Sequence, residues 1–381
     1  MTPITRLVGL AASTTLVLGL AACSVEEEAP AGTATEDAAV DETSDDTTET
    51  SDDAAGTGDA SSPAPAAAEG DGTLVLYSGR NEELVQPVLD AFTDETGIAV
   101  EVRYGDTAAM AAQLLEEGDN SPAEVFLAQD AGALGAVARE GLLGELPAET
   151  LDLVPDTYES AQGDWVGLTG RSRVLVYNKE AVSEDELPET VAELTEPAWT
   201  GRVGIAPTNA SFQSFVTALR VLEGDDAAAQ WLDGLAANDP QVRERNGMIV
   251  ADVDSGAIDA GLVNHYYLYE LADEQGVPAD DLNAALHFFP AGDAGALVNI
   301  SGIGLVGEQA DAEGQALVDY LLSEAGQTYF VEETHEYPMI EGVGTPAGLP
   351  ALDELETPEI DLNDLDDLQR TIEMITEAGL L

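Results

Sequence analysis

Two adjacent tyrosines, Tyr266 and Tyr267, stand where an apolar stretch gives way to a helical pattern. Residues 259–264 are typical of a strand and residues 268–275 of a helix, so the doublet is predicted at the carboxyl end of a strand, where open α/β sheets bind ligands. Phenol oxygens that converge there suit a hard cation such as Fe(III), because such a cation stabilises phenolate well below its free pKa of about 10. The doublet alone also fits tyrosines that pack with their hydroxyl groups hydrogen-bonded.

Catalytic patterns are sparse in the rest of the chain. The only histidines are His265, His287 and His335, and the sequence contains neither a G-x-S-x-G elbow nor an H-E-x-x-H pair. No phosphate-binding glycine loop is found, and acidic pairs are uninformative because carboxylates are so numerous. We therefore expect a binding protein and not an enzyme.

The composition limits the classes of partner. The 381 residues include 75 Asp and Glu but only 12 Lys and Arg, which gives a formal net charge of −63. A chain so acidic is not expected to bind nucleic acid through its own field. Hydrophobic residues make up 44% of the chain and occur in periodic runs, which separates most of it from acidic disordered proteins. So acidic a surface indicates a salty habitat or a solubility strategy.

The N-terminus has the pattern of an export signal. An apolar stretch, residues 7–22, follows Arg6 and ends in Leu-Ala-Ala-Cys at Cys23, the only cysteine of the chain. This ending resembles a bacterial lipobox, which implies cleavage before Cys23, lipidation of its sulfur and a membrane-anchored protein outside the cytoplasm. The alternative is an ordinary signal peptide with a coincidental cysteine.

The predicted organisation has three parts. Residues 1–22 form the lipoprotein signal peptide, and residues 23–72 form the lipidated cysteine with a disordered acidic tether. Beyond Cys23 the tether carries 15 acidic residues and neither lysine nor arginine, so it cannot bury enough apolar surface to fold. Residues 73–381 form the folded domain.

The folded domain alternates short apolar runs with amphipathic segments. Residues 82–97 have apolar positions at helical spacing, and helices are expected in most of the other intervals. This alternation predicts an α/β fold with mainly parallel sheets and two lobes. Lobe 1 is expected at about 73–172 and 299–345, and lobe 2 at about 177–296 and 346–381. The runs predicted as strands span residues 73–78, 98–105, 123–128, 173–178, 201–206, 259–264 and 299–306.

Six segments of the chain resemble, in order, the ferric-iron substrate-binding proteins of bacterial ABC transporters. The most specific are G-R-S-R-V-L-V-Y-N and the later N-x-Y-Y. The resemblance implies a monomeric periplasmic-binding-protein fold whose two lobes are joined by crossing hinge strands. The central cleft would close on Fe(III) and a small synergistic anion such as carbonate, and an ABC permease would receive the iron. The matching segments are residues 71–105, 116–134, 163–182, 258–277, 292–306 and 336–340.

The same resemblance implies a ligand set. Tyr266 and Tyr267 would bind the metal, with Tyr177 as the third phenolate of the tyrosine-rich branch. Better-known members carry a histidine and a glutamate in the amino-terminal lobe, where this chain has Asn81 and Gln129. The departure favours members in which an anion or water completes the coordination.

Further polar residues are implied as anion contacts. Arg80 is the leading candidate; it precedes a predicted helix, so its guanidinium and the nearby backbone N–H groups could hold carbonate beside the metal. Arg171 and Arg173 are expected to pair with acidic neighbours, although either could contact the cleft. The remaining candidates, which could instead be simple caps, are Thr208, Asn209, Ser211, Asn246 and Asn264.

Other functions remain open on the sequence. A receptor of the same fold could bind an anion or an organic solute, such as a phosphonate or a polyamine, with the tyrosines packed against it. An extracellular hydrolase and a structural surface protein are remote alternatives. Visible colour would discriminate among them, because ferric phenolate absorbs visible light and the other states do not.

Overall fold

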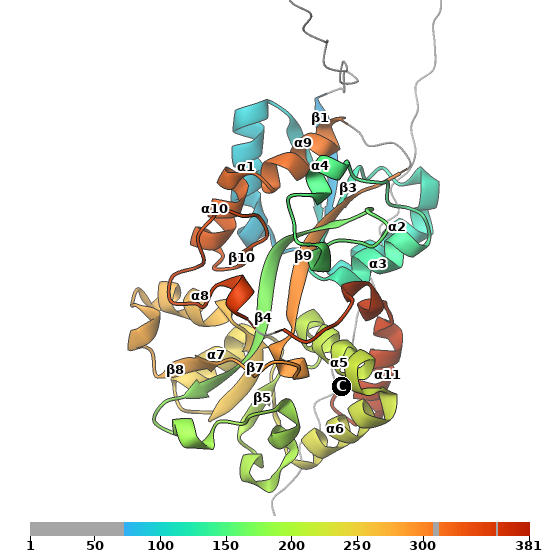
Figure 1. Ribbon diagram of the computed structural model, residues 1–381. Coiled ribbons are helices and arrows are strands. Elements are labelled where there is room, and N and C mark those ends of the chain that lie inside the picture. Colours follow the sequence, from blue (N-terminus) through green and yellow to red (C-terminus); the bar gives the residue numbers. More distant parts are fainter. Residues whose placement is uncertain (1–71, 308–311, 356) are drawn as a thin grey trace, which may run out of the picture. The chain divides into compact units, whose positions relative to one another are not determined.

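The computed structural model describes residues 72–307, 312–355 and 357–381 (Figure 1). The predicted signal peptide, the lipidation of Cys23 and the acidic tether through residue 71 lie outside the described residues. Within the described ranges, no helix is both long and apolar enough to cross a membrane.

One mixed sheet organises the described chain. Its strand order is β2-β1-β3-β9-β4-β7-β5-β6, and β8 and β10 also pair with β4. The strands are β1 (Thr73–Ser78), β2 (Ala99–Tyr104), β3 (Val125–Ala128), β4 (Val166–Asn178), β5 (Val203–Ile205), β6 (Gln241–Val242), β7 (Ala260–Asn264), β8 (Ala284–His287), β9 (Val298–Leu305) and β10 (Tyr337–Pro338).

Helices fill most intervals between the strands, as expected. The predicted helix at 82–97 is α1, which buries its apolar positions and ends where Gly97 adopts a φ of 78° and donates its N–H to Thr93 O. The helices are α1 (Glu82–Thr96), α2 (Thr107–Glu117), α3 (Ala131–Arg139), α4 (Ala148–Leu151), α5 (Ala210–Glu223), α6 (Asp225–Ala237), α7 (Asn246–Asp254), α8 (Tyr266–Gln275), α9 (Ala312–Leu321), α10 (Glu324–Glu333) and α11 (Leu368–Glu377).

The long strand β4 belongs to both halves of the sheet. Its first part, to Ser172, pairs with β9, and its second part, from Arg173, pairs with β7 and β8. The run predicted at 173–178 is therefore only the second half of a strand of 13 residues. In Figure 1, β4 and β9 run side by side from the lobe of β1–β3 to the lobe of β5–β8. These are the expected crossing strands.

Strand direction differs from the prediction at the centre of the sheet. The outer pairs, β1 with β2 and β3, and β5 with β6 and β7, are parallel as expected. The prediction of mainly parallel pairing is wrong at the centre, where β4 and β9 run antiparallel to each other. In addition, β9 is antiparallel to β3, and β4 is antiparallel to β7. The physical reason is that the chain crosses to lobe 2 through β4 and returns through β9.

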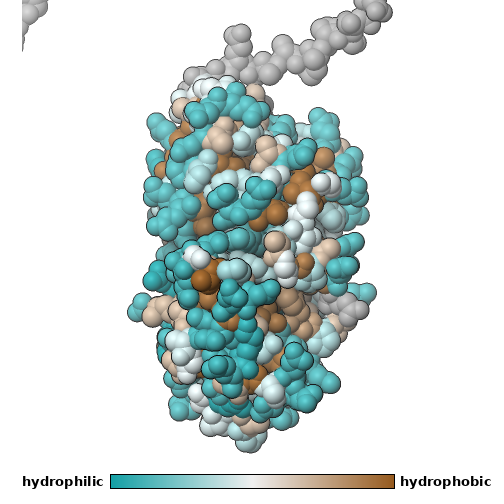
Figure 2. Space-filling view, turned by 90° about the vertical axis from the view of Figure 1, so that its left-hand side faces the viewer, coloured by the Kyte–Doolittle hydropathy of each residue, from teal (hydrophilic) through white to brown (hydrophobic). Residues whose placement is uncertain are grey.

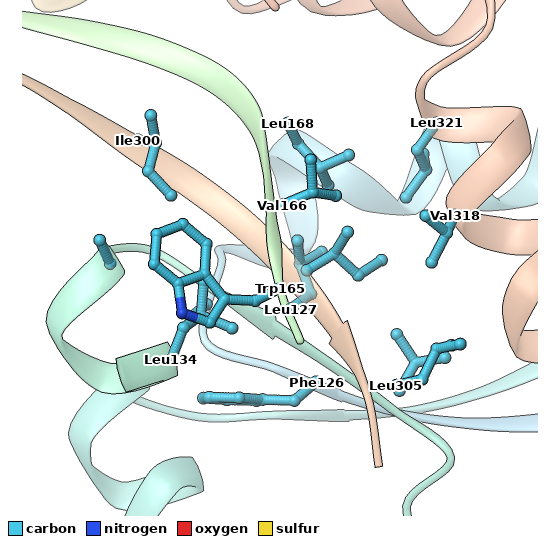
Figure 3. Close-up of a cluster of buried hydrophobic side chains, with 14 of the residues drawn as sticks. Phe126, Leu127, Leu134, Trp165, Val166, Leu168, Ile300, Leu305, Val318 and Leu321 are labelled. Atoms are coloured by element: carbon cyan, nitrogen blue, oxygen red, sulfur yellow. The ribbon is translucent and has the colours of Figure 1, made fainter. Parts of the chain in front are cut away.

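Each lobe has its own apolar core. The lobe 1 core includes Trp165, fully buried with Phe126, Leu134 and Ile300 (Figure 3). Lobe 2 has one cluster on each face of its part of the sheet. The first is centred on the aromatic residues of α5 and α6, and the second lies between the sheet, α7 and α8. The outer surface is mainly hydrophilic on the face shown in Figure 2, in agreement with the acidic composition.

The C-terminal segment packs on both lobes. Leu362 and Leu365, in the short helix η9 (Leu362–Asp366), belong to the lobe 1 core, whereas Met374 and Ile375 of α11 belong to the core of lobe 2. Residues 346–381 were expected wholly in lobe 2. The packing divides them, because η9 lies against α3 before the chain reaches α5 and α6.

Candidate metal centre

The tyrosine doublet lies at the carboxyl end of a buried strand, as predicted. Strand β7 ends at Asn264, and Tyr266 and Tyr267 are the first two residues of α8. Their ring centroids are 4.2 Å apart with an angle of 32° between the planes. Tyr266 is 3% exposed. The turn from strand to helix thus lets two neighbouring side chains lie together, which a continuing strand would prevent.

Both hydroxyl groups of the doublet are held in the protonated form. Burial raises the pKa of Tyr266 well above its ordinary value, and the charge of Tyr267 would raise it further. Burial also raises the pKa of Tyr267, although hydrogen bonds with Tyr266 and Asn246 oppose this effect. A cation that binds here must therefore displace two protons. A metal of high charge can do this, whereas a neutral solute cannot.

Three buried arginines surround the doublet. Arg80, Arg171 and Arg173 are 4%, 3% and 2% exposed, and each interacts electrostatically with Tyr266. Burial lowers the pKa of Arg173 to about 9, while the two tyrosines act in the opposite direction. The centre is thus locally positive in a strongly acidic protein, and it favours phenolate and other anions.

Arg80 already has an acidic partner. Its Nη2 is 2.9 Å from Oε2 of Glu336, and its Nη1 donates to Thr169 Oγ1 at 3.4 Å. The other oxygen of Glu336 lies 3.7 Å from Nε of Arg171. The expected pairing of Arg171 with an acidic neighbour is therefore confirmed. The side chain predicted as the main anion contact, Arg80, is engaged with a carboxylate.

Arg173 is held differently. Its Nη1 donates to Ser211 Oγ and Asn264 Oδ1, both at 3.3 Å, and its Nη2 donates to Leu262 O at 2.8 Å. The guanidinium also lies 5.6 Å from the ring of Phe215. The part of the chain that the structure describes provides no acidic partner for it and no hydrogen-bond acceptor for its Nε. The expectation of an acidic neighbour is wrong for Arg173, which faces the cleft.

A small hollow beside these arginines is lined by residues of both lobes. It is lined from lobe 1 by Gln129 and Asp130, and from lobe 2 by Ser211 and Asn264. Arg171 closes its lobe 1 side and donates to the backbone oxygen of Gln129. Donors from both lobes therefore face one space. The full lining is Gln129, Asp130, Arg171, Arg173, Ala210, Ser211, Asn264, Leu297 and Asn299.

The predicted polar residues at the start of α5 form one network. Asn209 caps the helix, because its Oδ1 accepts from the Ser211 N–H at 3.0 Å and from Ser211 Oγ at 2.6 Å. Nδ2 of the buried Asn246 donates to Ser211 Oγ at 2.9 Å, while its own Oδ1 has no hydrogen-bond partner among the described residues. Thr208 is exposed and contributes no side-chain bond to this network.

Among the described residues, no side-chain hydrogen bond joins two other predicted residues, Asn81 and Tyr177, to the doublet. Asn81 is exposed at the N-cap of α1 and makes no side-chain capping bond. Tyr177 pairs with Ala260 across the sheet, whereas Arg173 pairs with Asn264. Four residues of strand separate Tyr177 from the level of the doublet, a distance of about 13 Å. The structure therefore does not bring Tyr177 to the other two tyrosines, and burial with the charge of Glu184 raises its pKa.

Sequence reasoning missed two carboxylates at the centre. Glu270 follows Tyr266 by one helical turn, and burial raises its pKa to about 7, with Glu336 adding to the shift. The spacing of four residues could have indicated Glu270. Glu336 is 1% exposed and lies 70 positions beyond Tyr266, so no local signal could have identified it. In the described ranges, no group of three or more His, Cys, Asp or Glu side chains could hold a metal ion. The tyrosines therefore remain the candidate ligands.

Comparisons with known proteins identify the family of this chain. The family of bacterial extracellular solute-binding proteins matches residues 120–363. The chain is 34% identical over 317 residues to the Fe(3+)-binding periplasmic protein of Serratia marcescens, covering 83% of this chain and 93% of that protein.

Solved structures give the same result. Iron-bound HitA from Pseudomonas aeruginosa superposes with a TM-score of 0.76 at 36% identity, covering 81% of this chain and 99% of that one. IdiA (FutA) of Trichodesmium, in complex with iron and citrate, gives 0.70 at 29% identity, with coverage of 81% and 99%. These matches confirm the predicted two-lobed α/β fold and the predicted resemblance. The chain belongs to the family of bacterial extracellular solute-binding proteins, and the proteins to which it is similar include ferric-iron-binding proteins.

Proposed function

We propose that this protein is an extracytoplasmic receptor that binds Fe(III) and delivers it to an ABC permease. The observation that carries the proposal is the pair of the buried Tyr266 and the half-buried Tyr267, whose ring centroids lie 4.2 Å apart at the carboxyl end of β7. The names of the relatives, which include an Fe(3+)-binding periplasmic protein, support the same cargo.

The chemistry of the doublet fits a trivalent metal. Phenolate oxygens are hard donors, and a metal that binds them replaces two protons. Because the pKa values of both tyrosines are raised in the metal-free protein, binding releases protons and acid favours release of the metal. Asn81 and Gln129 leave room for an anion or water to complete the coordination.

The anion is proposed to lie in the hollow beside Arg171 and Arg173. The Nε of Arg173 has no hydrogen-bond partner among the described residues, and Ser211 and Asn264 face the same space. Arg80, the residue favoured from the sequence, is engaged with Glu336 and is assigned a supporting role. Citrate accompanies iron in the similar Trichodesmium protein, which supports an anion of this kind.

The alternative solutes fit the centre less well. A polyamine would place positive charges against three buried arginines, which repel it, and unlike Fe(III) it cannot displace the phenol protons to gain two negative charges. A phosphonate could use the arginines but would leave the two phenol groups of the doublet without a function. Among the proposals, Fe(III) with an anion uses both sets of groups.

Membrane attachment through Cys23 is a separate part of the proposal. A lipid on Cys23 would hold the folded domain at the outer face of the cytoplasmic membrane, with the acidic segment as the tether. Replacement of this cysteine, Cys23→Ser, is expected to abolish labelling by a lipid precursor and to release the protein from membranes. Unchanged labelling would refute the anchor and leave the metal site untouched.

Titration of Fe(III) with the visible spectrum as readout tests the metal site. Phe keeps the ring and removes the donor oxygen, so Tyr266→Phe and Tyr267→Phe are expected to bleach or shift the charge-transfer band. Tyr177→Phe is the matched control, because Tyr177 pairs with Ala260, four residues before the end of β7. The proposal fails if both doublet variants keep the wild-type colour and iron affinity. A loss in Tyr177→Phe alone would return the site to the ligand set implied by the family resemblance.

A further inference from the structure

Glu336 is a buried carboxylate shared by two arginines. It is 1% exposed and precedes β10. Its Oε2 accepts from Arg80 Nη2 at 2.9 Å and from Thr334 Oγ1 at 3.1 Å, and its Oε1 lies 3.7 Å from Arg171 Nε. Burial opposes its charge, but the two arginines outweigh burial and hold the pKa of Glu336 below its usual value. The carboxylate is therefore charged at neutral pH.

The two guanidinium groups come from different parts of lobe 1. Arg80 lies in the loop between β1 and α1, and Arg171 lies on β4 just before the strand changes partner. Arg171 also donates to Ile300 O at 2.6 Å, on the other crossing strand. Glu336 thus fixes one cation from a loop and one from the hinge in a single arrangement.

The segment that carries Glu336 is also bonded to the start of the tyrosine helix. The N–H of Ser172 donates to Nδ1 of His265 at 3.1 Å, so Nε2 carries the proton and donates to His335 O at 2.8 Å. His265 immediately precedes Tyr266, and the two rings meet edge to face at 5.9 Å. The position of Glu336 relative to the doublet is therefore set by hydrogen bonds on both sides.

The charges of the arginines, Glu336 and the tyrosines do not cancel once the metal is bound. The arginines at positions 80, 171 and 173 bring three positive charges, and Glu336 brings one negative charge. Two phenolates balance the remainder, so bound Fe(III) leaves about three positive charges for the accompanying anion and for the carboxyl groups of Glu270 and Asp130, the second of which lines the hollow. Replacing the carboxylate by a neutral amide would raise this excess by one charge.

We propose that Glu336 holds the guanidinium groups of Arg80 and Arg171 beside the tyrosine pair and offsets part of their charge, and that it thereby determines which anion the site accepts with the metal. This inference rests on the proposed function. Glu336 does not touch the metal in this scheme, and it acts through the two arginines. A merely structural ion pair would stabilise the fold without affecting the choice of anion.

The test compares the iron affinity in carbonate with that in citrate, at pH 8, where Glu270 is ionised. In Glu336→Gln the added positive charge is expected to favour the more highly charged citrate, by about tenfold in the ratio of affinities. Arg80→Gln changes the local charge in the other direction and is expected to shift the ratio about tenfold toward carbonate. The double variant restores the charge and is expected to return the ratio to that of the wild type.

Glu313→Gln is the matched control, because Glu313 is another buried carboxylate of lobe 1, 6% exposed, that bonds the backbone of Gly72. It is expected to lower thermal stability without changing the anion ratio. If Glu336→Gln does not fold, the anion ratios of Arg80→Gln and of the double variant still test the proposal. The inference is overturned if the ratio stays constant in every folded variant while only the melting temperature changes. Absence of ferric colour in the wild type with either anion would instead overturn the proposed function.

Discussion

The buried imidazole of His265 predicts a specific dependence of stability on pH. Burial lowers the pKa of His265 to about 4 from an ordinary value of 6.5, although its bond to His335 O acts in the other direction. Below pH 6.5 the unfolded chain takes up a proton on this residue, whereas the folded protein does not until about pH 4. The unfolded state therefore binds more protons in this window, and the free energy of unfolding falls as the pH falls.

The size of the effect follows from the two pKa values. A difference of about 2.5 units corresponds to about 3 kcal/mol, lost progressively between pH 6.5 and 4. In His265→Gln this loss is absent, although the variant is less stable at pH 7.5 because the Ser172 N–H loses its acceptor, a cost of about 1–3 kcal/mol. The stability difference between the two proteins should therefore shrink, or change sign, toward pH 4.

Urea unfolding followed by tryptophan fluorescence between pH 7.5 and 4 measures this difference. The carboxylates titrate alike in both proteins, so their contribution cancels. His287→Gln is the control for loss of a histidine bonded to a backbone carbonyl, since His287 Nε2 lies 2.8 Å from Pro188 O and the ring is partly exposed. Parallel stability curves for the wild type and His265→Gln over the whole range would refute the reasoning.

Three further predictions concern the C-terminal segment, the centre and the α5 cap. A Cβ at Gly132 would lie 2.4 Å from Leu365 O. Gly132→Ala is therefore expected to displace η9 and to lower the free energy of unfolding by about 1–3 kcal/mol in a thermal melt. Gly344→Ala is the control and should be neutral, because the space around Gly344 is open. Burial raises the pKa of Glu270 to about 7, so the wild type loses stability as the pH rises from 4.5 to 7. Relative to the wild type, Glu270→Gln should gain about 1–2 kcal/mol of unfolding free energy by pH 8, a reduced value because the carboxyl is partly exposed. A stability difference that stays constant with pH would contradict this. Asn209→Ala should cost about 1 kcal/mol through loss of the cap and also weaken iron binding in carbonate, whereas a stability loss with unchanged binding would limit Asn209 to capping.

The local pattern of the sequence was sufficient for several elements. The apolar run at 73–78 forms β1 with the predicted bounds, and the helical spacing after Asn81 forms α1. The place of Tyr266 and Tyr267 at the end of β7 was also predictable, because a strand that changes to a helix is visible within about ten residues. The alternation of strands and helices predicted the two lobes, the family resemblance added their crossing strands, and the acidic charge was evident from composition.

Tertiary structure decided which of the candidate residues meet. Arg80, Arg171 and Glu336 are far apart in the chain, and their contact depends on how the crossing strands and the segment before β10 are arranged. Sheet register separates Tyr177 from the doublet, and hydrophobic periodicity does not encode register between distant strands. The sequence alone determined the local elements and the chemical types available to them. Only the tertiary structure determined the charge partners of those groups and the directions of β4 and β9. The reason is that the periodicity of apolar residues indicates which side chains are buried but does not indicate which distant residues they contact.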